Sequence, residues 1–318
     1  MAVYTPVSED DLKTFLLSYN IGSLMSYEGI EAGVSNTNYH LFTDHDRFIL
    51  TLFEPHRVHL EDIPFFIDYS MHLEEHGVQC PQTMRRKNGQ AISQLCDRPA
   101  VIFSFLEGSG ATAATLTPEM CNRAGKTLAH MHKAAESFPK TQENRFGLPR
   151  WRQWLHEMGR SINKVSDGLY LAAAAELSWI EEHWRTDLPQ GAIHADFFPD
   201  NVFFKDGIVS GVIDFHFVCT DFFAYDLAIA VNAWTFDDSN TFVPERFDAM
   251  MAGYESVRPL SVHEKLAFPL LLRAASLRFL LSRCEEFLKW QPGDFMKPHD
   301  PLVFAKRVQF FQGRDLNV

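Results

Sequence analysis

The sequence predicts an α+β protein with two lobes, a small β-rich lobe followed by a larger and mainly helical one. Its 318 residues are about twice the usual length of a domain. Short strand-like runs dominate before residue 108, and apolar residues at helical spacing dominate after it. The hydrophobic fraction of 46% is typical of a globular chain. We therefore expect one lobe over residues 1–107 and a second over residues 108–318.

Strand and helix signals alternate in the small lobe. Ser8, followed by three acidic residues, predicts a helix that runs to about Tyr19. Alternating apolar residues over 38–42 and 47–53 predict two strands around a polar turn. These strands are the expected framework of the lobe.

The remainder of the small lobe also shows alternating helix and strand signals. A helix is expected over 61–76, ended by Gly77. Asn88-Gly89 is a hairpin turn signal with a strand candidate on each side, and the apolar run over 99–106 predicts a further strand. We expect a small sheet with one or two helices.

Helical patterns dominate the larger lobe. A Gly-rich connection at 107–110 precedes a helix over 118–135, with Thr117 as its N-cap. Strand character returns only over 191–215, where Lys205-Asp206-Gly207 predicts the turn of a hairpin. The later segments have helical spacing, most clearly 222–234, 244–254 and 262–290.

The charge balance and the cysteines exclude several classes of protein. With 29 Lys and Arg against 41 Asp and Glu, the net charge is −12, so a nucleic-acid partner is not expected. The five cysteines form no Cys-x-x-Cys pair, and neither a disulfide framework nor a zinc cluster is indicated. The N-terminus lacks the pattern of a signal peptide, and no apolar run is long enough to cross a membrane. These features predict a cytoplasmic protein.

Three polar residues interrupt the apolar strands of the predicted hairpin. Asp196 and Asn201 stand five positions apart, and Asp214 follows the second strand. The same spacing joins the base and the metal-binding Asn in the kinase signature H-R-D-L-x-x-x-N, and Asp214 takes the place of the magnesium Asp of D-F-G. Asp196 is therefore predicted to orient a hydroxyl and take its proton, and Asn201 and Asp214 to hold Mg²⁺. The alternative is that these residues only cap turns.

Segments over the whole chain resemble one enzyme family. His194-Ala-Asp-Phe-Phe-Pro-Asp-Asn201 is similar to the catalytic loop of the aminoglycoside phosphotransferase and choline kinase superfamily, with Ala195 in place of Gly and Phe198 in place of the second His. Residues 211–228 resemble bacterial homoserine kinases of the protein-kinase-like type. Four further segments agree with that family: 33–39, 48–54, 277–283 and 297–301.

The resemblance implies a protein-kinase-like fold, with ATP between the lobes and O-phosphohomoserine as the product. It also implies that residues 33–38 form a loop over the phosphates of ATP. Its Gly allows close approach of the backbone, and its polar side chains can donate to phosphate oxygens. The residues assigned to this contact are Gly33, Ser35, Asn36 and Asn38. Taken alone, the run is only a polar β-turn.

One residue departs from the pattern of most kinases. Thr51 stands where a Lys usually pairs with phosphate. A hydroxyl cannot neutralise phosphate charge, so another cation is expected to compensate, and His56 and Arg57 are the nearest candidates in the sequence. The family implies a hinge for adenine at the end of strand 99–106. Its main-chain groups belong to Ser104, Phe105 and Leu106.

A zwitterionic substrate such as homoserine requires a cation for its carboxylate. Arg278 and Arg283 lie on a helix that is otherwise apolar, where an unpaired guanidinium is costly. They either clamp the substrate carboxylate or form structural ion pairs. The candidate partners for such pairs are Glu285, Glu286 and Asp226.

Four further residues complete the candidate set. Asp221 is expected near the substrate ammonium, and Asp226 is expected to anchor the catalytic loop. His194 is expected to brace that loop by a hydrogen bond. His194 and His216 suggest a metal site with Asp214, but no further ligand supports zinc.

Two alternatives to a homoserine kinase stay open. The same residues suit another small hydroxyl substrate, such as choline, ethanolamine, an aminoglycoside or a sugar. The absent strand Lys also suggests a nucleotide-binding pseudoenzyme, against which the complete set of Asp196, Asn201 and Asp214 argues.

Overall fold

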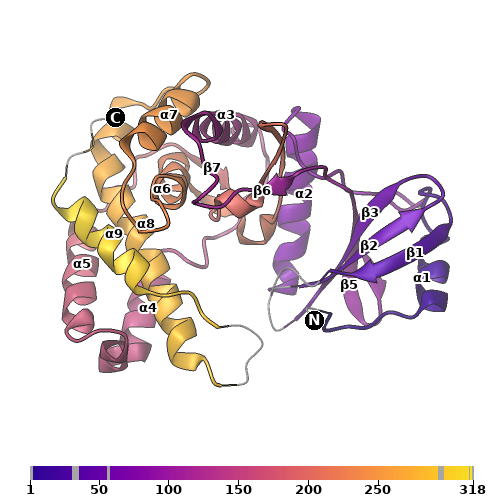
Figure 1. The fold of residues 1–318 in the computed structure, drawn as a ribbon, viewed down its shortest axis with the longest axis horizontal. Coiled ribbons are helices and arrows are strands. Elements are labelled where there is room, and N and C mark those ends of the chain that lie inside the picture. Colours follow the sequence, from indigo (N-terminus) through magenta and orange to yellow (C-terminus); the bar gives the residue numbers. More distant parts are fainter. Residues whose placement is uncertain (1–2, 31–35, 56–57, 293–296, 315, 317–318) are drawn as a thin grey trace. The chain divides into compact units, whose positions relative to one another are not determined.

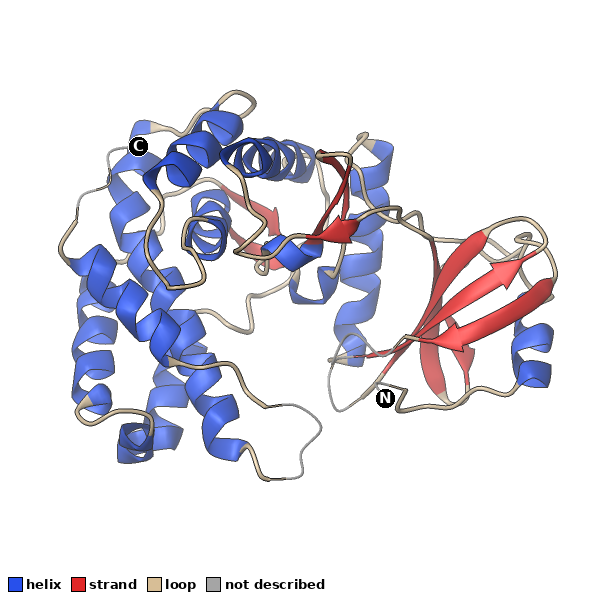
Figure 2. Ribbon diagram, viewed as in Figure 1, coloured by secondary structure: helices blue, strands red, loops and turns tan. Residues whose placement is uncertain are grey.

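The computed structural model of the chain describes residues 3–30, 36–55, 58–292, 297–314 and 316. The chain forms two compact units, drawn in Figures 1 and 2. The first unit consists of Met1–Gly110, Ser137–Gln142 and Asn201–Val218. The second consists of Ala111–Glu136, Glu143–Asp200 and Cys219–Val318. Two segments from the later part of the chain thus return to the first unit, while the predicted lobe boundary near residue 108 remains a prediction.

The first unit is built on a five-stranded antiparallel sheet in the order β1-β2-β3-β5-β4. A smaller sheet in the order β6-β8-β9 belongs to the same unit. In chain order the elements are α1 (Glu9–Leu16), β1 (Leu24–Gly29), β2 (Asn36–Thr43), β3 (Arg47–Phe53), η1 (Leu60–Asp62), α2 (Ile63–Glu75), β4 (Ser93–Leu95), β5 (Arg98–Ser104), β6 (Ser109–Gly110), β8 (Val202–Lys205), β9 (Ile208–Val212) and η4 (Phe215–Phe217).

Helix α1 covers one face of the large sheet (Figure 1). Alternate residues of β2, β3 and β5 point to this face and form an apolar core with α1. The members from these elements are Leu12, Phe15, Leu16, Tyr39, Leu41, Phe48, Leu50, Leu52, Ala100 and Ile102. Because side chains alternate along a strand, the intervening residues Asn38, Thr51 and Val101 share the opposite face, where the register pairs Asn38 with Thr51 and Thr51 with Val101.

Most predicted elements of the first unit are present, with two differences. Ser8 caps α1 by accepting a hydrogen bond from the Asp11 N–H at 3.1 Å, as its sequence pattern predicts. Strand β1 was not predicted, because it is mostly exposed and has no apolar alternation. The hairpin expected at Asn88-Gly89 is wrong, since no strand directly precedes that turn and β4, which follows it, pairs with β5. Strands β4 and β5 pair instead across Cys96 and Asp97, which adopt the positive φ angles of 51° and 58°.

The second unit is mainly helical (Figure 2), with one two-stranded sheet of β7 and β10. Its elements are α3 (Pro118–Ala135), α4 (Leu148–Met158), η2 (Gly159–Lys164), α5 (Leu169–His183), β7 (Gln190–Ile193), β10 (Cys219–Phe222), α6 (Phe223–Trp234), α7 (Pro244–Glu255), α8 (Val262–Lys289) and α9 (Leu302–Gln312). A short 3-10 helix, η3 (Pro199–Asn201), carries the chain toward β8.

Helix α6 is the buried centre of this unit, with eleven buried positions among its twelve residues. Helices α3 and α7 cross so closely that a Cβ atom on Gly125 would lie 2.2 Å from the Met250 carbonyl oxygen. A Cβ atom on Gly253 would lie 2.0 Å from the Asn122 carbonyl oxygen. Glycine is therefore required at both positions.

The long helix α8 starts with a capping box. Ser261 accepts from the Glu264 N–H at 3.2 Å, and the Glu264 carboxylate accepts from the Ser261 N–H at 2.9 Å. None of the helices in the described part of the chain is both long and apolar enough to span a membrane.

Candidate active site

The loop that carries Asp196 belongs to the second unit, and the carboxylate of Asp226 binds its main chain. Ala195 has a φ of +60°, a left-handed conformation that an L-residue adopts at a cost. Asp226, on α6, accepts hydrogen bonds from the N–H groups of His194 and Ala195, each at 2.8 Å. Its side chain is fully buried. Asp226 therefore fixes the backbone immediately before Asp196.

A buried chain of hydrogen bonds extends from Asp226 to the start of α8. His132 Nε2 lies 3.0 Å from the Asp226 carboxylate, and its Nδ1 lies 2.7 Å from the Tyr254 hydroxyl. Arg258 donates to the Tyr254 oxygen at 3.1 Å and to Glu264 at 2.8 Å. Burial lowers the pKa of His132, against the opposing effect of Asp226. The ring is therefore neutral, with its Nε2–H donating to Asp226 and the Tyr254 hydroxyl donating to its Nδ1.

The loop beyond Asp196 is held through main-chain atoms. The N–H of Phe198 donates to the Asp196 carbonyl at 2.8 Å. Trp234, on α6, donates from its indole to the Phe197 carbonyl at 2.9 Å. The backbone on both sides of Asp196 is thus fixed by hydrogen bonds.

Asn201 and Asp214 lie together at one end of the β8–β9 hairpin in the first unit. Val202 pairs with Val212 in the antiparallel register, and the Ile213 N–H donates to the Asn201 carbonyl at 2.9 Å. Asp214 has a φ of +67° and its side chain is 40% exposed. The fold therefore brings together the two residues that the sequence predicts as metal ligands.

His216 contacts Asp214 directly, since its Nδ1 meets Oδ1 of the Asp214 carboxylate. Its imidazole is largely covered, with 10% of the side chain exposed. Among the described residues, no three His, Cys, Asp or Glu side chains are grouped to hold a metal ion. Asn201 and Asp214 supply one carboxamide and one carboxylate, which fits Mg²⁺ because this ion takes one or two protein carboxylates and completes its shell with phosphates and water.

The predicted phosphate loop is described only in part. Gly33 and Ser35, like His56 and Arg57, lie outside the described residues. Asn38 is described, and its Oδ1 accepts a hydrogen bond from the Thr51 hydroxyl at 2.7 Å. This bond fixes the side-chain oxygen of Asn38, so its Nδ2 amide group is the end that can donate a hydrogen bond.

Asn36, the first residue of β2, also belongs to the predicted loop. Its Oδ1 is buried, and within the described residues it accepts no hydrogen bond. A buried amide oxygen is costly to leave unpaired, so a donor from a ligand would be favourable at this position.

The predicted hinge residues Ser104, Phe105 and Leu106 differ in whether their main-chain N–H groups are already hydrogen-bonded within the protein. The N–H of Ser104 donates to the Gln82 carbonyl at 2.8 Å, and the N–H of Phe105 donates to the Arg47 carbonyl at 3.2 Å. Both groups are used to fix β5 and its end. Of the three residues predicted to bind adenine, only Leu106 has a main-chain N–H that is not used in these two bonds.

Arg278 and Arg283, on α8, are placed among aromatic rings. The Arg278 guanidinium lies 3.9 Å from the centroid of Phe279, and that of Arg283 lies 4.4 Å from the centroid of Phe304. Burial lowers the pKa of Arg283 to about 10, and the charge of Asp196 is among those that oppose this shift. In the described part of the chain no carboxylate lies within ion-pair distance of Arg283.

Two of the three acids predicted as partners of these arginines have other contacts, while Glu286 acts on Arg283 only as a nearby charge. Glu285 pairs with Arg150 at 3.1 Å and with Lys289 at 2.8 Å. Asp226 binds the catalytic loop and His132, as described above. The partly buried guanidinium of Arg283, with no carboxylate of the described chain at ion-pair distance, favours an anionic ligand.

Asp221 lies on β10 of the same unit and accepts a hydrogen bond from the Asn144 amide at 2.6 Å. Its other carboxylate oxygen accepts from the Phe222 N–H at 2.7 Å. Burial raises the pKa of Asp221, although both hydrogen bonds oppose the rise. The second unit thus holds three carboxylates of the candidate site, Asp196, Asp221 and Asp226, and its two arginines.

Two residues that contact candidate site groups escape sequence reasoning. Asn144 is 77 positions from Asp221 and His132 is 94 positions from Asp226. Neither lies in a motif that names its partner. His132, in the run Leu-Ala-His-Met-His of an amphipathic helix, offered one signal, because a polar ring on the buried face of a helix needs a partner.

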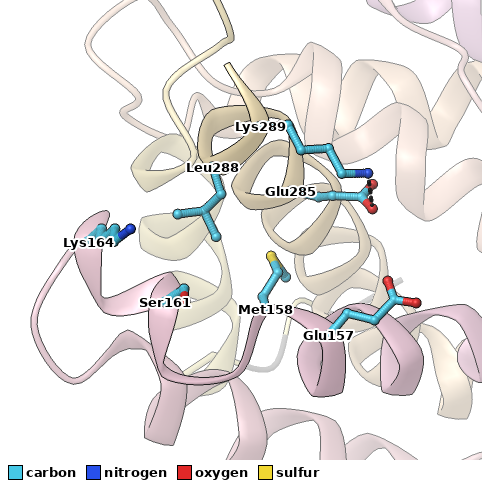
Figure 3. A pocket seen from close by; sticks show the side chains of 7 residues that line it. All are labelled: Glu157, Met158, Ser161, Lys164, Glu285, Leu288 and Lys289. Atoms are coloured by element: carbon cyan, nitrogen blue, oxygen red, sulfur yellow. Dashed lines mark hydrogen bonds and ion pairs between the residues drawn. The ribbon is translucent and has the colours of Figure 1, made fainter. Parts of the chain in front are cut away.

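The surface also has hollows that contain none of the predicted site residues. One in the second unit has a volume of about 260 Å³ and lies where α4, η2 and α8 meet (Figure 3). Lys289 and Glu285 form an ion pair on its wall, and Met158 and Leu288 also line it. One in the first unit, of about 480 Å³, lies beside α1 and β1.

Comparisons with known proteins agree with the motif reading. Residues 26–260 match the model of the phosphotransferase enzyme family. The chain is 47% identical over 316 residues to a homoserine kinase of Methylobacterium radiotolerans, covering 99% of this chain and 98% of that protein. It is 44% identical over 312 residues to a homoserine kinase of Nitrobacter hamburgensis, covering 98% and 95%.

Solved structures are similar in fold at low sequence identity. Amicoumacin kinase in complex with AMP-PNP and Ca²⁺ has a TM-score of 0.73 at 14% identity, covering 96% of this chain and 93% of that one. A choline kinase from Cryptosporidium parvum has a TM-score of 0.64 at 14% identity, covering 91% and 88%. The predicted α+β, protein-kinase-like fold class is thereby confirmed.

Proposed function

The chain belongs to the phosphotransferase enzyme family, and from this premise we propose that it is an ATP-dependent homoserine kinase. It transfers the terminal phosphoryl group of ATP to the side-chain hydroxyl of L-homoserine, which yields O-phospho-L-homoserine. The observation that carries the proposal is the near full-length similarity to curated homoserine kinases. The candidate site residues explain how the chain performs this transfer.

Asp196 is the proposed base. It orients the substrate hydroxyl and takes its proton as the oxygen attacks the phosphorus atom. The loop around it is held by hydrogen bonds from its main chain to Asp226 and from Trp234. A carboxylate on a defined backbone keeps the reacting atoms in position at little further entropic cost.

Asn201 and Asp214 are the proposed ligands of Mg²⁺, which neutralises charge on the phosphates of ATP when bound. Their places at one end of the hairpin, fixed by the Ile213–Asn201 hydrogen bond, support the assignment. His216 contacts the Asp214 carboxylate and limits its rotation.

Substrate recognition is assigned to the second unit. The proposed partner of the homoserine carboxylate is Arg283, because it is partly buried and no carboxylate of the described chain pairs with it. Arg278 adds positive charge to the same helix. Asp221, fixed by Asn144, is the proposed partner of the ammonium group. A choline-like cation would leave the charge of Arg283 without a partner.

The missing strand Lys has a partial substitute in the first unit. The Thr51 hydroxyl holds the side-chain oxygen of Asn38, which leaves the Nδ2 amide group of Asn38 to donate. An amide N–H is a suitable donor for a phosphate oxygen. Neutralisation of charge then depends on Mg²⁺ at Asp214 and Asn201. We expect ATP binding to be strongly dependent on magnesium.

The function is tested by measuring ADP release with homoserine, choline, ethanolamine and an aminoglycoside as acceptors. Homoserine alone is expected to support rapid release. Asp196→Asn should lower kcat by roughly 10²–10⁴-fold, whereas Asp200→Asn, an exposed change on the same loop, should leave it unaltered. Rapid release with another acceptor would replace homoserine as the substrate, and no release with any acceptor would favour the pseudoenzyme.

The role of Arg283 has its own test. Homoserine and 3-aminopropanol differ only by the carboxylate, so the ratio of their kcat/KM values measures recognition of that group. Arg283→Gln is expected to lower this ratio by about 10–100-fold, the value of a charge-assisted hydrogen bond, without changing KM for ATP. An unchanged ratio would assign the carboxylate to another residue.

A further inference from the structure

Helix α2 carries two histidines, outside the candidate active site, whose rings converge on one point. His72 and His76 lie four positions apart, so their side chains share a face of the helix. Their ring centroids are 4.1 Å apart, with an angle of 38° between the planes. The Nε2 atom of each ring lies 3.2 Å from the Ser137 hydroxyl oxygen. The two nitrogens therefore face the same small volume.

Hydrogen bonding decides which nitrogen of His76 carries the proton. Its Nδ1 lies 2.8 Å from the main-chain carbonyl oxygen of His72. A carbonyl oxygen only accepts, so Nδ1 is the donor, and in the neutral ring the lone pair is on Nε2. Histidines that bind metals have this arrangement, with one nitrogen donating to a carbonyl and the other directed at the ion.

The Ser137 hydroxyl lies between the two Nε2 atoms, at the position where an ion would bind. Its hydroxyl has one proton and can donate to only one of the two Nε2 atoms. A cation bound between the rings accepts a lone pair from both. His76 is exposed and His72 is half-buried, so the position is accessible from solvent.

The surroundings keep the two rings in place. The segment 137–142 lies along α2, where Lys140 pairs with Asp68 and Gln142 donates to Asp62 at 2.8 Å. The ring of Phe138 packs 5.2 Å from that of His72. The His72 ring is thus fixed by packing, and the His76 ring by its bond to the helix backbone.

We propose that His72 and His76 form a binding site for a first-row transition-metal cation, with water completing the coordination. Two imidazoles one helical turn apart suit Zn²⁺, Ni²⁺ or Cu²⁺. Mg²⁺ and Ca²⁺ prefer oxygen ligands, so this site is chemically distinct from the one proposed at Asn201 and Asp214. The net charge of −12 further favours a cation.

The test uses the full chain, freed of metal by a chelator and kept in excess Mg²⁺ so that the Asp214 position does not take up zinc. Zn²⁺ is titrated against a competing chromophoric chelator. The wild type is expected to bind one Zn²⁺ more tightly than its other histidines do, and His76→Gln to weaken this binding at least tenfold. His59→Gln, which also removes a histidine exposed beside an acidic residue, is the matched control and should bind like the wild type.

Thermal unfolding provides a second measurement that separates lost binding from lost folding. Without metal, His76→Gln should unfold at the same temperature as the wild type, because the changed side chain is exposed. Zinc should raise the unfolding temperature of the wild type more than that of the variant. Equal affinity and equal stoichiometry in the wild type and in a His72→Asn, His76→Gln double variant would overturn the proposal. So would equal weakening by His59→Gln and His76→Gln.

Discussion

The two loops that carry the proposed catalytic groups are held in different ways. In the second unit, the loop before Asp196 rests on the fully buried Asp226, which accepts two main-chain hydrogen bonds and one from His132. In the first unit, the loop of Asp214 depends on the register of a short hairpin, and its carboxylate is 40% exposed. Ala195 and Asp214 share positive φ angles, 60° and 67°.

The difference matches the chemistry that we propose for each loop. A base must be in place before the substrate arrives, and a buried network supplies that order. A metal ligand gains its partner only with the ion, so a carboxylate near solvent avoids the cost of a buried unpaired charge. We therefore expect removal of a group that supports the Asp196 loop to lower the stability of the fold, and a change at Asp214 to affect mainly activity.

The largest effect on stability is expected for Asp226→Ala. It leaves two buried N–H groups and the His132 Nε2–H without an acceptor, at about 1–3 kcal/mol for each. The free energy of unfolding should fall by about 3 kcal/mol or more, measured by urea denaturation. Asp200→Ala, at an exposed position, is the control and should change it by no more than about 0.5 kcal/mol. Equal stability of the two variants would mean that the network does not hold the loop.

His132→Gln should have a smaller effect, with a characteristic pH dependence. The pKa of His132 is lowered in the folded protein, because burial disfavours the charged ring. Below about pH 6.5 His132 is protonated in the unfolded chain but stays neutral in the folded chain. The free energy of unfolding therefore decreases as the pH is lowered. We expect the variant to lose roughly 1–2 kcal/mol at neutral pH.

The difference in the free energy of unfolding between His132→Gln and the wild type should shrink as the pH falls below about 6.5. The wild type loses stability there because His132 is protonated only when unfolded, and the variant has no titrating group at this position. Urea denaturation at several pH values measures this difference. A gap that stays constant or widens toward low pH would contradict a neutral, buried His132.

Ala195→Gly should act in the opposite direction. Glycine adopts the φ of +60° without the steric cost that an L-residue bears, so the free energy of unfolding should rise by about 1 kcal/mol. Ala192→Gly, on β7 and buried like Ala195, is the matched control. It should destabilise the protein by about 0.5–1 kcal/mol. The same sign for both variants would show that the strain at Ala195 is negligible.

The smallest effect on stability is expected for Asp214→Asn. Its exposed side chain should allow a change within about 0.5 kcal/mol. Activity should nevertheless be almost abolished, and the gain in unfolding temperature that Mg²⁺ with ATP produces in the wild type should disappear. Strong destabilisation in the absence of ligand would remove the contrast between the two loops.

Local patterns determined much of this protein. Caps at Ser8, Thr117 and Ser261 mark helix starts because a side-chain oxygen meets an N–H only three residues away. The spacing of Asp196 and Asn201 is likewise a property of one short segment. The sequence therefore predicts the fold class, most elements and the proposed catalytic set.

Tertiary structure alone decided the contacts between residues far apart in the chain. Asp226 could be suspected as an anchor, but His132, 94 positions away, became its partner only through the packing of α3 against α6. Of the two alternatives for Arg283, the ion pairs do not form among the residues that the structure describes, and its guanidinium packs against Phe304. Strand β4 pairs across Cys96-Asp97 and not at Asn88-Gly89. A motif encodes which groups do chemistry, because those groups are close in sequence. Which buried charge finds a partner depends on which helices meet, and that is a property of the folded chain.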